Sequence, residues 1–252
     1  MTDVLQKPET ASATGTAPFL IGEGMTGGYG RGGPDILHDC TIAVNPGEIA
    51  VIVGPNGAGK STAMKAVFGM LDLRAGHVRL DGEDITHLSP QDRVRRGMGF
   101  VPQVRNIFPS MTVEENLEMG AFIRDDDISE TMEQIYDLFP ILREKRRQPA
   151  GELSGGQRQQ VAVGRALMTK PKVLMLDEPT AGVSPIVMDE LFDLIIEIAR
   201  TGLPVLMVEQ NARQALEIAD RGYVLVQGRN AFTGTGAELL ADPEVRRSFL
   251  GG

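Results

Sequence analysis

The chain has 252 residues, of which 42% are hydrophobic and 23% charged, and this composition excludes a collagen, a coiled coil and a wholly disordered chain. The formal net charge of −9 disfavours a dedicated nucleic-acid surface, so we expect no nucleic-acid partner. The single cysteine, Cys40, cannot form an internal disulfide, which fits a reducing cytosol.

The pattern of elements predicts an α/β fold. Residues 1–18 lack an apolar core behind a basic segment, and their Thr, Ala, Ser and Pro content predicts a disordered tail. After it, short apolar runs alternate with amphipathic segments, which is typical of a mostly parallel sheet. No apolar run approaches the ~20 residues of a membrane helix, so contact with a membrane must come through a partner. In chain order we predict a strand at 49–53, a helix at 61–71, a hairpin turning at 81–82, a strand at 99–103, strands at 173–176 and 205–208, and between these last two a helix that begins at 184–185 and stops at 202.

Residues 104–152 have helical spacing throughout. Thr112 and Glu115 are spaced as a capping box that opens a helix through Ala121. Ile128, Met132, Ile135 and Phe139 fall on one face of a further helix. We therefore predict one domain over 19–252, with a β-rich part and phosphate loop at 19–103, a helical subdomain at 104–152 and the remainder of the catalytic core at 153–252.

A phosphate-binding loop follows the first predicted strand. Residues 54–61, GPNGAGKS, match G-x-x-x-x-G-K-[ST] between a strand and a helix, the context that this motif requires. Its backbone N–H groups and the helix start favour phosphate, Lys60 neutralises the β and γ phosphates, and the Ser61 hydroxyl binds Mg²⁺. The predicted nucleotide-binding residues here are Gly54, Asn56, Gly57, Gly59, Lys60, Ser61 and Thr62.

A second glycine motif upstream has the wrong context. Gly22, Gly24 and Gly27 spell G-x-G-x-x-G, but the glycine-rich stretch after them cannot form a helix. We therefore do not expect a dinucleotide fold.

Two carboxylates end the predicted strand at 173–176. Asp177 is placed to hold Mg²⁺ through water, and Glu178 to orient or deprotonate the water that attacks the γ phosphate. Taken alone, this stretch also fits a strand followed by an exposed acidic turn. The phosphate loop upstream favours the catalytic interpretation.

The sequence LSGGQ at 153–157 is the most specific motif. Ser154 and Gln157 are spaced as a capping box, so Gly155 and Gly156 occupy a first helical turn without side chains over their N–H groups. Two residues that disfavour helix are unexpected there. The motif predicts a second anion-binding helix start.

With these motifs in this order, residues 19–250 resemble the nucleotide-binding subunit of an ATP-binding cassette (ABC) system. The resemblance implies ATP and Mg²⁺, with Gln103 in the Q-loop position, Ser61, Gln103 and Asp177 at the metal, and Tyr29 stacked on adenine. It also implies a head-to-tail pair of cassettes, in which the signature at 154–157 acts on the nucleotide of the other copy.

Two positions depart from the family pattern. Ser184 stands where the family usually has aspartate, and Gln210 stands at the place of the switch histidine. Glutamine can donate a hydrogen bond to the γ phosphate but cannot take up a proton, so we expect Gln210 to position and Glu178 to carry hydrolysis.

The segments VEQN at 208–211, ADRGY at 219–223 and MTVEENL at 111–117 are similar to one ATPase subunit of branched-chain amino-acid importers. That resemblance implies membrane permease subunits, a second ABC ATPase or a second copy of this chain, indirect contact with a periplasmic binding protein, and a place on the cytoplasmic face of the inner membrane. Importers of urea or short amides, a soluble ABC protein of translation, repair or iron–sulfur assembly, and a switch that barely hydrolyses ATP remain alternatives.

Overall fold

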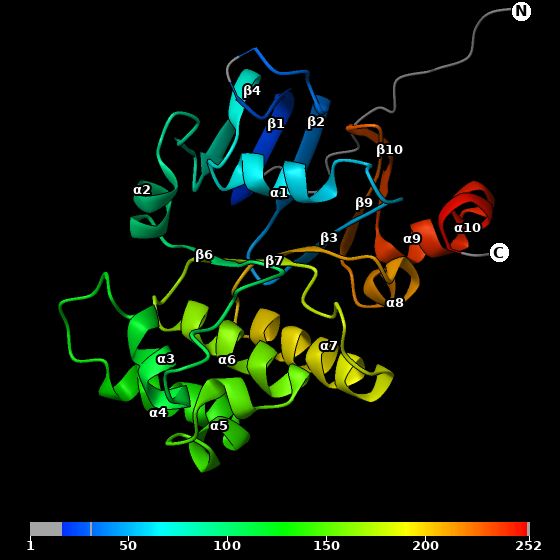
Figure 1. Ribbon diagram of the computed structural model, residues 1–252. Coiled ribbons are helices and arrows are strands. Elements are labelled where there is room, and N and C mark those ends of the chain that lie inside the picture. Colours follow the sequence, from blue (N-terminus) through cyan, green and yellow to red (C-terminus); the bar gives the residue numbers. More distant parts are fainter. Residues whose placement is uncertain (1–16, 31, 251–252) are drawn as a thin grey trace, which may run out of the picture.

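The computed structural model describes residues 17–30 and 32–250, so the predicted tail lies almost wholly outside the described residues. The described chain is an α/β fold with two sheets and helices around them (Figure 1). This confirms the predicted fold class.

The larger sheet is mostly parallel and contains the strands predicted at 49–53, 99–103, 173–176 and 205–208. Its order is β10-β9-β3-β8-β7-β6, and only the pairing of β10 with β9 is antiparallel. The strand order places β7 between β6 and β8, so residues that follow these three strands meet at one edge. The strands are β3 (Ile49–Val53), β6 (Met98–Val101), β7 (Val173–Asp177), β8 (Val205–Val208), β9 (Arg221–Val226) and β10 (Arg229–Gly234).

The smaller sheet is antiparallel, in the order β2-β1-β4-β5. The G-x-G-x-x-G stretch lies inside its strand β1, where the pairing register shifts twice, which excludes the dinucleotide interpretation. The hairpin is confirmed, since Asp81 and Gly82 turn with φ of 52° and 77° between β4 and β5. The strands are β1 (Leu20–Gly28), β2 (Leu37–Val44), β4 (Asp72–Leu80) and β5 (Glu83–Asp84).

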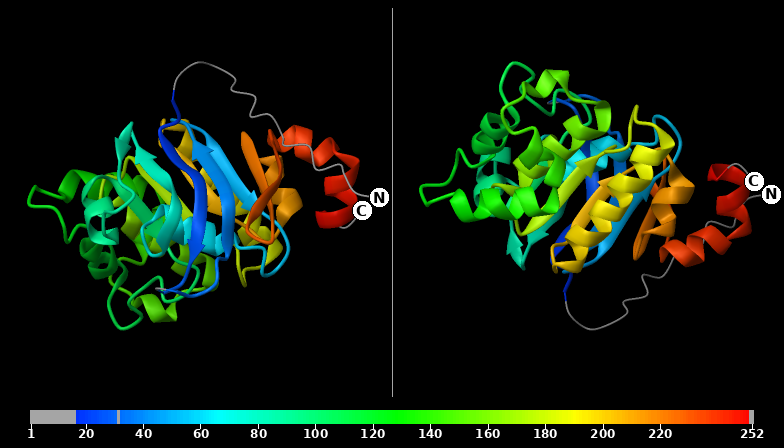
Figure 2. Two further views of the ribbon diagram at one scale, coloured as in Figure 1. Left: turned by 90° about the horizontal axis from the view of Figure 1, so that it is seen from above. Right: turned by 90° about the horizontal axis from the view of Figure 1, so that it is seen from below.

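The helices divide between the two faces of the larger sheet. Helix α1 packs between the two sheets, whereas α3 to α7 lie on the opposite side (Figure 1), and α7 runs along that face when the molecule is seen from below (Figure 2). They are α1 (Lys60–Val67), α2 (Pro90–Arg95), α3 (Val113–Gly120), α4 (Ser129–Leu138), α5 (Pro140–Glu144), a 3₁₀ turn (Ala150–Glu152), α6 (Gly155–Leu167), α7 (Pro185–Arg200), α8 (Ala212–Glu217), α9 (Gly236–Ala241) and α10 (Pro243–Phe249).

Two apolar cores meet at β3. Val51 and Val53 pack into the core beneath the helices α3 to α8, while Ala50 and Ile52 pack into the core around α1. All residues of β3 are buried, as expected for a strand covered on both faces. The strand that leads into the phosphate loop is therefore held from both sides.

Helix α1 ends four residues before the predicted position. The buried guanidinium of Arg93 donates to the carbonyl groups of Val67 and Ala66, at 2.5 and 3.3 Å, and Gly69 then turns with φ of 83°. The last carbonyl groups of a helix lack partners within it, and the Arg93 side chain supplies donors for these two carbonyl groups. Gly69 is also a local signal for this end, since its N–H donates to Ala66 O at 3.0 Å and Met70 N–H donates to Lys65 O at 2.8 Å, as in helices that stop at a glycine.

The predicted helix starts are confirmed in position. Thr112 and Glu115 form both bonds of the capping box at α3, and the predicted apolar face of α4 is buried or half-buried against the core. Ser184 occupies the N-cap position of α7, but its side chain makes no capping hydrogen bond. Proline at the first position of α7 already presets the helical φ there.

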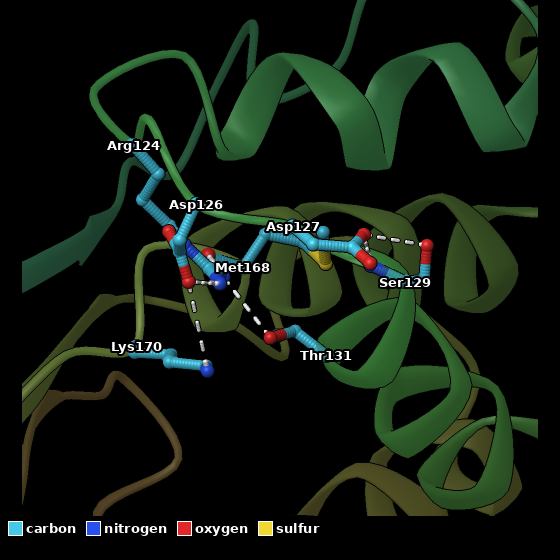
Figure 3. Close-up of polar contacts among 7 residues, drawn as sticks. All are labelled: Arg124, Asp126, Asp127, Ser129, Thr131, Met168 and Lys170. Atoms are coloured by element: carbon cyan, nitrogen blue, oxygen red, sulfur yellow. Dashed lines mark hydrogen bonds and ion pairs between the residues drawn. The ribbon is translucent and has the colours of Figure 1, made fainter.

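A buried arginine fixes the loop between α3 and α4 (Figure 3). Arg124 donates to the carbonyl of Met168 at 2.8 Å and to the hydroxyl of Thr131 at 3.0 Å, and it forms two bonds with the carboxylate of Asp126. Lys170 lies 4.0 Å from the same carboxylate. The loop is thereby tied to both the start of α4 and the end of α6.

Candidate nucleotide-binding and hydrolysis site

The loop after β3 closes around a cavity at the start of α1. Gly54 has φ of 145°, and a Cβ on it would lie 2.2 Å from the carbonyl oxygen of Leu225, so only glycine fits there. Gly59 precedes α1 with φ of 96°. The cavity has a volume of about 280 Å³ and is lined by Asn56, Gly57, Ala58, Gly59, Lys60, Ser61, Thr62 and Glu178.

Lys60 lies folded over its own loop. Its Nζ donates to the carbonyl oxygens of Gly54 and Pro55 at 2.9 and 3.2 Å, and the residue is buried. Burial lowers the pKa of Lys60, and the charges of Glu178 and Asp177 oppose this shift. Phosphate oxygens are better partners for an ammonium group than carbonyl oxygens, so a bound nucleotide can take over these donors.

Ser61, which lines the cavity, forms a hydrogen-bonded pair with Asp177. The Ser61 hydroxyl donates to Asp177 Oδ1 at 2.9 Å, and the carboxylate is buried at the end of β7. Burial raises the pKa of Asp177, while the bond from Ser61 opposes that shift. A hydroxyl beside one carboxylate fits Mg²⁺, which keeps several waters and binds substrate phosphates in such sites. Among the described residues, no group of three or more His, Cys, Asp or Glu converges to form an all-protein cage.

Glu178 accepts hydrogen bonds from both sides. Gln103, which follows β6, and Gln210, which follows β8, both donate through Nε2 to Glu178 Oε2, at 2.6 and 2.8 Å. Because β7 lies between β6 and β8, the sheet order itself puts the carboxylate between the two amides. Gln103 thus turns its N–H toward Glu178 in this structure, and its place at the metal stays a prediction.

The backbone of Glu178 is strained. Its φ of 51° lies in the left-handed region, which is uncommon for a residue with a side chain. The conformation is held by Glu178 N–H, which donates to Val208 O at 2.9 Å, and by Ala181 N–H, which donates to Glu178 O at 3.1 Å. Strain of this kind is characteristic of functional sites.

Three residues near Glu178 escaped the sequence analysis as functional candidates. Glu209 is buried, and its carboxylate accepts from the N–H and the hydroxyl of Thr180 and from the N–H of Gln210. Asn211 donates to the Thr180 hydroxyl at 3.4 Å. Burial raises the pKa of Glu209, and the bonds from Thr180 oppose this shift. The sequence signals are the charge of Glu209 directly after a buried strand and the place of Glu209 and Asn211 in the VEQN segment.

The signature forms a capped helix start, as predicted. Gln157 N–H donates to Ser154 Oγ at 3.3 Å, and Ser154 N–H donates to Gln157 Oε1 at 3.1 Å. Gly155 is exposed, but Gly156 is buried, and a Cβ on it would lie 2.3 Å from a methyl carbon of Val187. Gly156 is therefore required by its packing against Val187, which the motif did not indicate.

Within the described chain, the wall of the cavity includes neither the signature at 154–157 nor Tyr29, and of the other predicted site residues it also lacks Gly54, Gln103 and Asp177. Tyr29 is half exposed in the loop after β1. Their predicted contacts with nucleotide therefore remain predictions. One contact joins the two regions, since Asn106, three residues after Gln103, donates to Gln159 Oε1 on α6 at 2.8 Å.

A larger cavity of about 520 Å³ lies elsewhere. Arg124 and Lys170 of Figure 3 line it together with residues of α2 and the β4–β5 turn, and it shares no lining residue with the first cavity. Its charged lining residues are mostly basic, with Asp81 and Glu83 as the acidic ones. It lacks the helix start and the paired carboxylates of the first cavity, so size does not decide which of them is the nucleotide site.

The comparison with protein families agrees with this geometry. The family model described as ABC transporter matches residues 37–181, more than half of the chain. The chain belongs to the ABC transporter family. It is an ABC ATPase, with the phosphate loop, Gln103, the signature and the acidic strand end all inside the matched region.

The relatives are ATP-binding proteins of transport systems. The high-affinity branched-chain amino acid transport ATP-binding protein BraG of Pseudomonas aeruginosa is 46% identical over 86% of this chain and 93% of its own. The probable branched-chain amino acid transport ATP-binding protein LivF of Archaeoglobus fulgidus is 43% identical over 86% and 92%. The lipopolysaccharide export system ATP-binding protein LptB of Escherichia coli is 39% identical over 87% and 92%.

Solved structures show the same cassette. The ADP conformation of MJ1267, an ATP-binding cassette of an ABC transporter, superposes with a TM-score of 0.82 at 30% identity, over 94% of this chain and all of the other. In the described part of this ABC ATPase, no helix has both the length and the apolar character to span a bilayer.

Proposed function

We propose that this ABC ATPase hydrolyses ATP on the cytoplasmic face of the inner membrane to drive the permease pair of an importer for branched-chain amino acids. The observation that carries the hydrolytic part is Glu178, which faces the phosphate-loop cavity with a glutamine amide on either side. Residues 19–252 act as one ATPase domain, with 104–152 as its helical subdomain.

The cavity supplies the groups that hold a nucleoside triphosphate. The backbone of 54–59 and the start of α1 receive the phosphates, and Lys60 exchanges its two carbonyl partners for β and γ oxygens. Ser61, Asp177 and Gln103 are the residues that would hold Mg²⁺. The ion would neutralise the charge that develops on the phosphates.

Hydrolysis depends on the carboxylate at the end of β7. Glu178 takes the proton of the attacking water, because it lines the cavity and has a free acceptor capacity in its carboxylate. Gln210 and Gln103 orient that carboxylate through Oε2. Gln210 contributes as a neutral donor and leaves proton transfer to Glu178.

The site is completed by a second cassette. Ser154, Gly155, Gly156 and Gln157 close over the nucleotide of the partner, which is either a second copy of this chain or a different ABC ATPase. The absence of the signature from the cavity wall supports this arrangement. Tyr29 stacks on the adenine. The periplasmic binding protein acts through the permease subunits.

The choice of solute is supported by the relatives named for branched-chain amino acids, at 46% and 43% identity. Lipopolysaccharide export is a second candidate, because LptB is 39% identical over a similar length. Import of urea or short amides is a third. The ATPase does not touch the solute, so transport must be measured directly.

The test is reconstitution of the chain with its permease subunits in proteoliposomes that contain ATP and Mg²⁺. We expect a binding protein loaded with leucine to stimulate turnover, and the same protein loaded with urea to leave it at the basal rate. Glu178→Gln should bind ATP without turnover. Stimulation by urea alone would overturn the assignment of the solute, and absence of ATP hydrolysis in the complete complex would overturn the enzymatic function.

A further inference from the structure

We infer that Glu209 is a positioning residue for hydrolysis, whose buried carboxylate joins the turn after Glu178 to the end of β8 and so holds Glu178 and Gln210 within reach of each other. This inference rests on the proposed ATPase function. It adds a residue that does not line the nucleotide cavity.

Glu209 is placed at the centre of the sheet edge. It follows β8 directly, is 1% exposed, and its N–H donates to the carbonyl of Ile52 on β3 at 3.1 Å. Its Oε1 accepts from Thr180 N–H at 3.0 Å. Its Oε2 accepts from the Thr180 hydroxyl at 2.9 Å and from Gln210 N–H at 3.2 Å.

These contacts close a ring through the catalytic carboxylate. The chain runs from Glu178 to Thr180, crosses to Glu209 by two hydrogen bonds, continues to Gln210, and returns to Glu178 Oε2 through the Gln210 amide at 2.8 Å. The strained φ of Glu178 lies inside this ring. Glu209 fixes Thr180, two residues after Glu178, and so restricts the turn that holds Glu178 at its positive φ.

Packing alone does not account for a carboxylate at this position. Within the described chain, no lysine or arginine forms an ion pair with Glu209, and a buried carboxylate without a cation is costly. Three donors converge on it, two from the turn after Glu178 and one from the backbone of Gln210. A glutamine of the same shape has only one oxygen and cannot accept all three.

The test uses Glu209→Gln in the reconstituted complex. We expect kcat to fall by about tenfold while KM for ATP changes by less than about twofold, because weakened bonds to a charged acceptor disturb Glu178 and leave the phosphate loop intact. The melting midpoint should not fall, because the substitution removes a buried charge. The matched control is Glu197→Gln, on an exposed position of α7, which should keep the parent kcat.

A second pair of variants addresses the other end of the contact. Thr180→Val removes the hydroxyl at nearly constant volume and should lower kcat, whereas Thr180→Ser keeps the hydroxyl and should retain most activity. Glu209→Gln combined with Thr180→Val should be little worse than Glu209→Gln alone, since both act on one network.

Hydrogen exchange gives a readout that does not need turnover. Glu209→Gln should speed exchange in the segments 178–182 and 210–212, with little change in the rest of the chain. Parent kcat together with parent exchange in these segments would overturn the inference, as would a loss of kcat that is accompanied by faster exchange throughout the chain. If the parent complex fails to hydrolyse ATP, the proposed function is wrong. Hydrogen exchange of Glu209→Gln in 178–182 and 210–212 still tests whether Glu209 holds these two segments together.

Discussion

Glu178 Oε2 accepts both glutamine amides, at 2.6 and 2.8 Å, and among the described residues no donor is directed at Oε1. The two carboxylate oxygens are therefore unequal before any nucleotide arrives. The two hydrogen bonds to Oε2 fix the orientation of the carboxylate, so a water that binds to Oε1 meets an acceptor that is already oriented. In the proposed function, the carboxylate is the base and its two amide neighbours are the positioning groups.

This division predicts unequal effects of substitution. Gln210→Ala should lower turnover by about tenfold or less, since one hydrogen bond contributes about 0.5–1.5 kcal/mol and Gln103 keeps its own bond to Glu178. Glu178→Gln should cost far more, because an amide cannot accept the proton of water. Steady-state ATPase rates of the reconstituted transporter decide the matter. If Gln210→Ala is as inactive as Glu178→Gln, then Gln210 belongs with the catalytic residues.

Among the elements, the contact between α6 and α7 constrains the signature. Val187, in the first turn of α7, occupies the space that a side chain on Gly156 would need. The capping box fixes where α6 begins, and this contact fixes how closely that start approaches the residues after Glu178. The position of the signature thus depends on α7 as well as on its own helix.

We expect Gly156→Ala to destabilise the protein by about 1–3 kcal/mol, the usual cost of overpacking. Gly155→Ala is the matched control, since its nearest neighbour, Val183, would lie 3.9 Å from the new Cβ, and it should change the free energy of unfolding by less than about 1 kcal/mol. Denaturant unfolding measures both. Combining Gly156→Ala with Val187→Ala should recover stability; a double variant no better than the single one would contradict the packing argument.

The loop of Figure 3 gives a prediction with a defined pH range. The bonds from Arg124 hold the pKa of Asp126 down at about 2. A carboxylate with a lowered pKa in the folded state stabilises above its unfolded pKa of about 3.9, and this contribution is lost as the pH falls through about 2. Asp126→Asn should therefore lower the melting midpoint slightly at pH 7, and the difference from the parent should shrink steadily below about pH 4. Thermal unfolding followed by circular dichroism tests this, and a difference independent of pH would contradict it.

The elements that were predictable from sequence have local causes. The strand at 49–53, the capping boxes at Thr112 and Ser154 and the Asp81-Gly82 turn are each specified by neighbouring residues. The residues missed were set by distant contacts. Strand β1 was not predicted, because it is rich in glycine and its partners β2 and β4 lie further along the chain. Glu209 could not be predicted as a site residue, because only the pairing of β8 with β7 brings it near Glu178.

For the whole molecule, the proposed function treats the phosphate-loop cavity and the signature as two halves of a site that only a second cassette completes. Glu178→Gln should therefore form a dimer that ATP and Mg²⁺ stabilise, since nucleotide would persist between the halves. Light scattering should show monomer without nucleotide and dimer with it, and Lys60→Ala should remain monomeric under both conditions. A monomer of Glu178→Gln at saturating ATP would mean that another ABC ATPase is the required partner.

The insertion of α3 to α6 between β6 and β7 has a mechanical meaning. These strands are neighbours in the sheet, yet 71 residues lie between Val101 at the end of β6 and Val173 at the start of β7. The backbone therefore enters and leaves the insertion at two adjacent points. The first exit runs through Gln103, whose amide is bonded to Glu178. A displacement of this insertion would therefore be transmitted through the segment that holds Gln103, next to the carboxylate of Glu178.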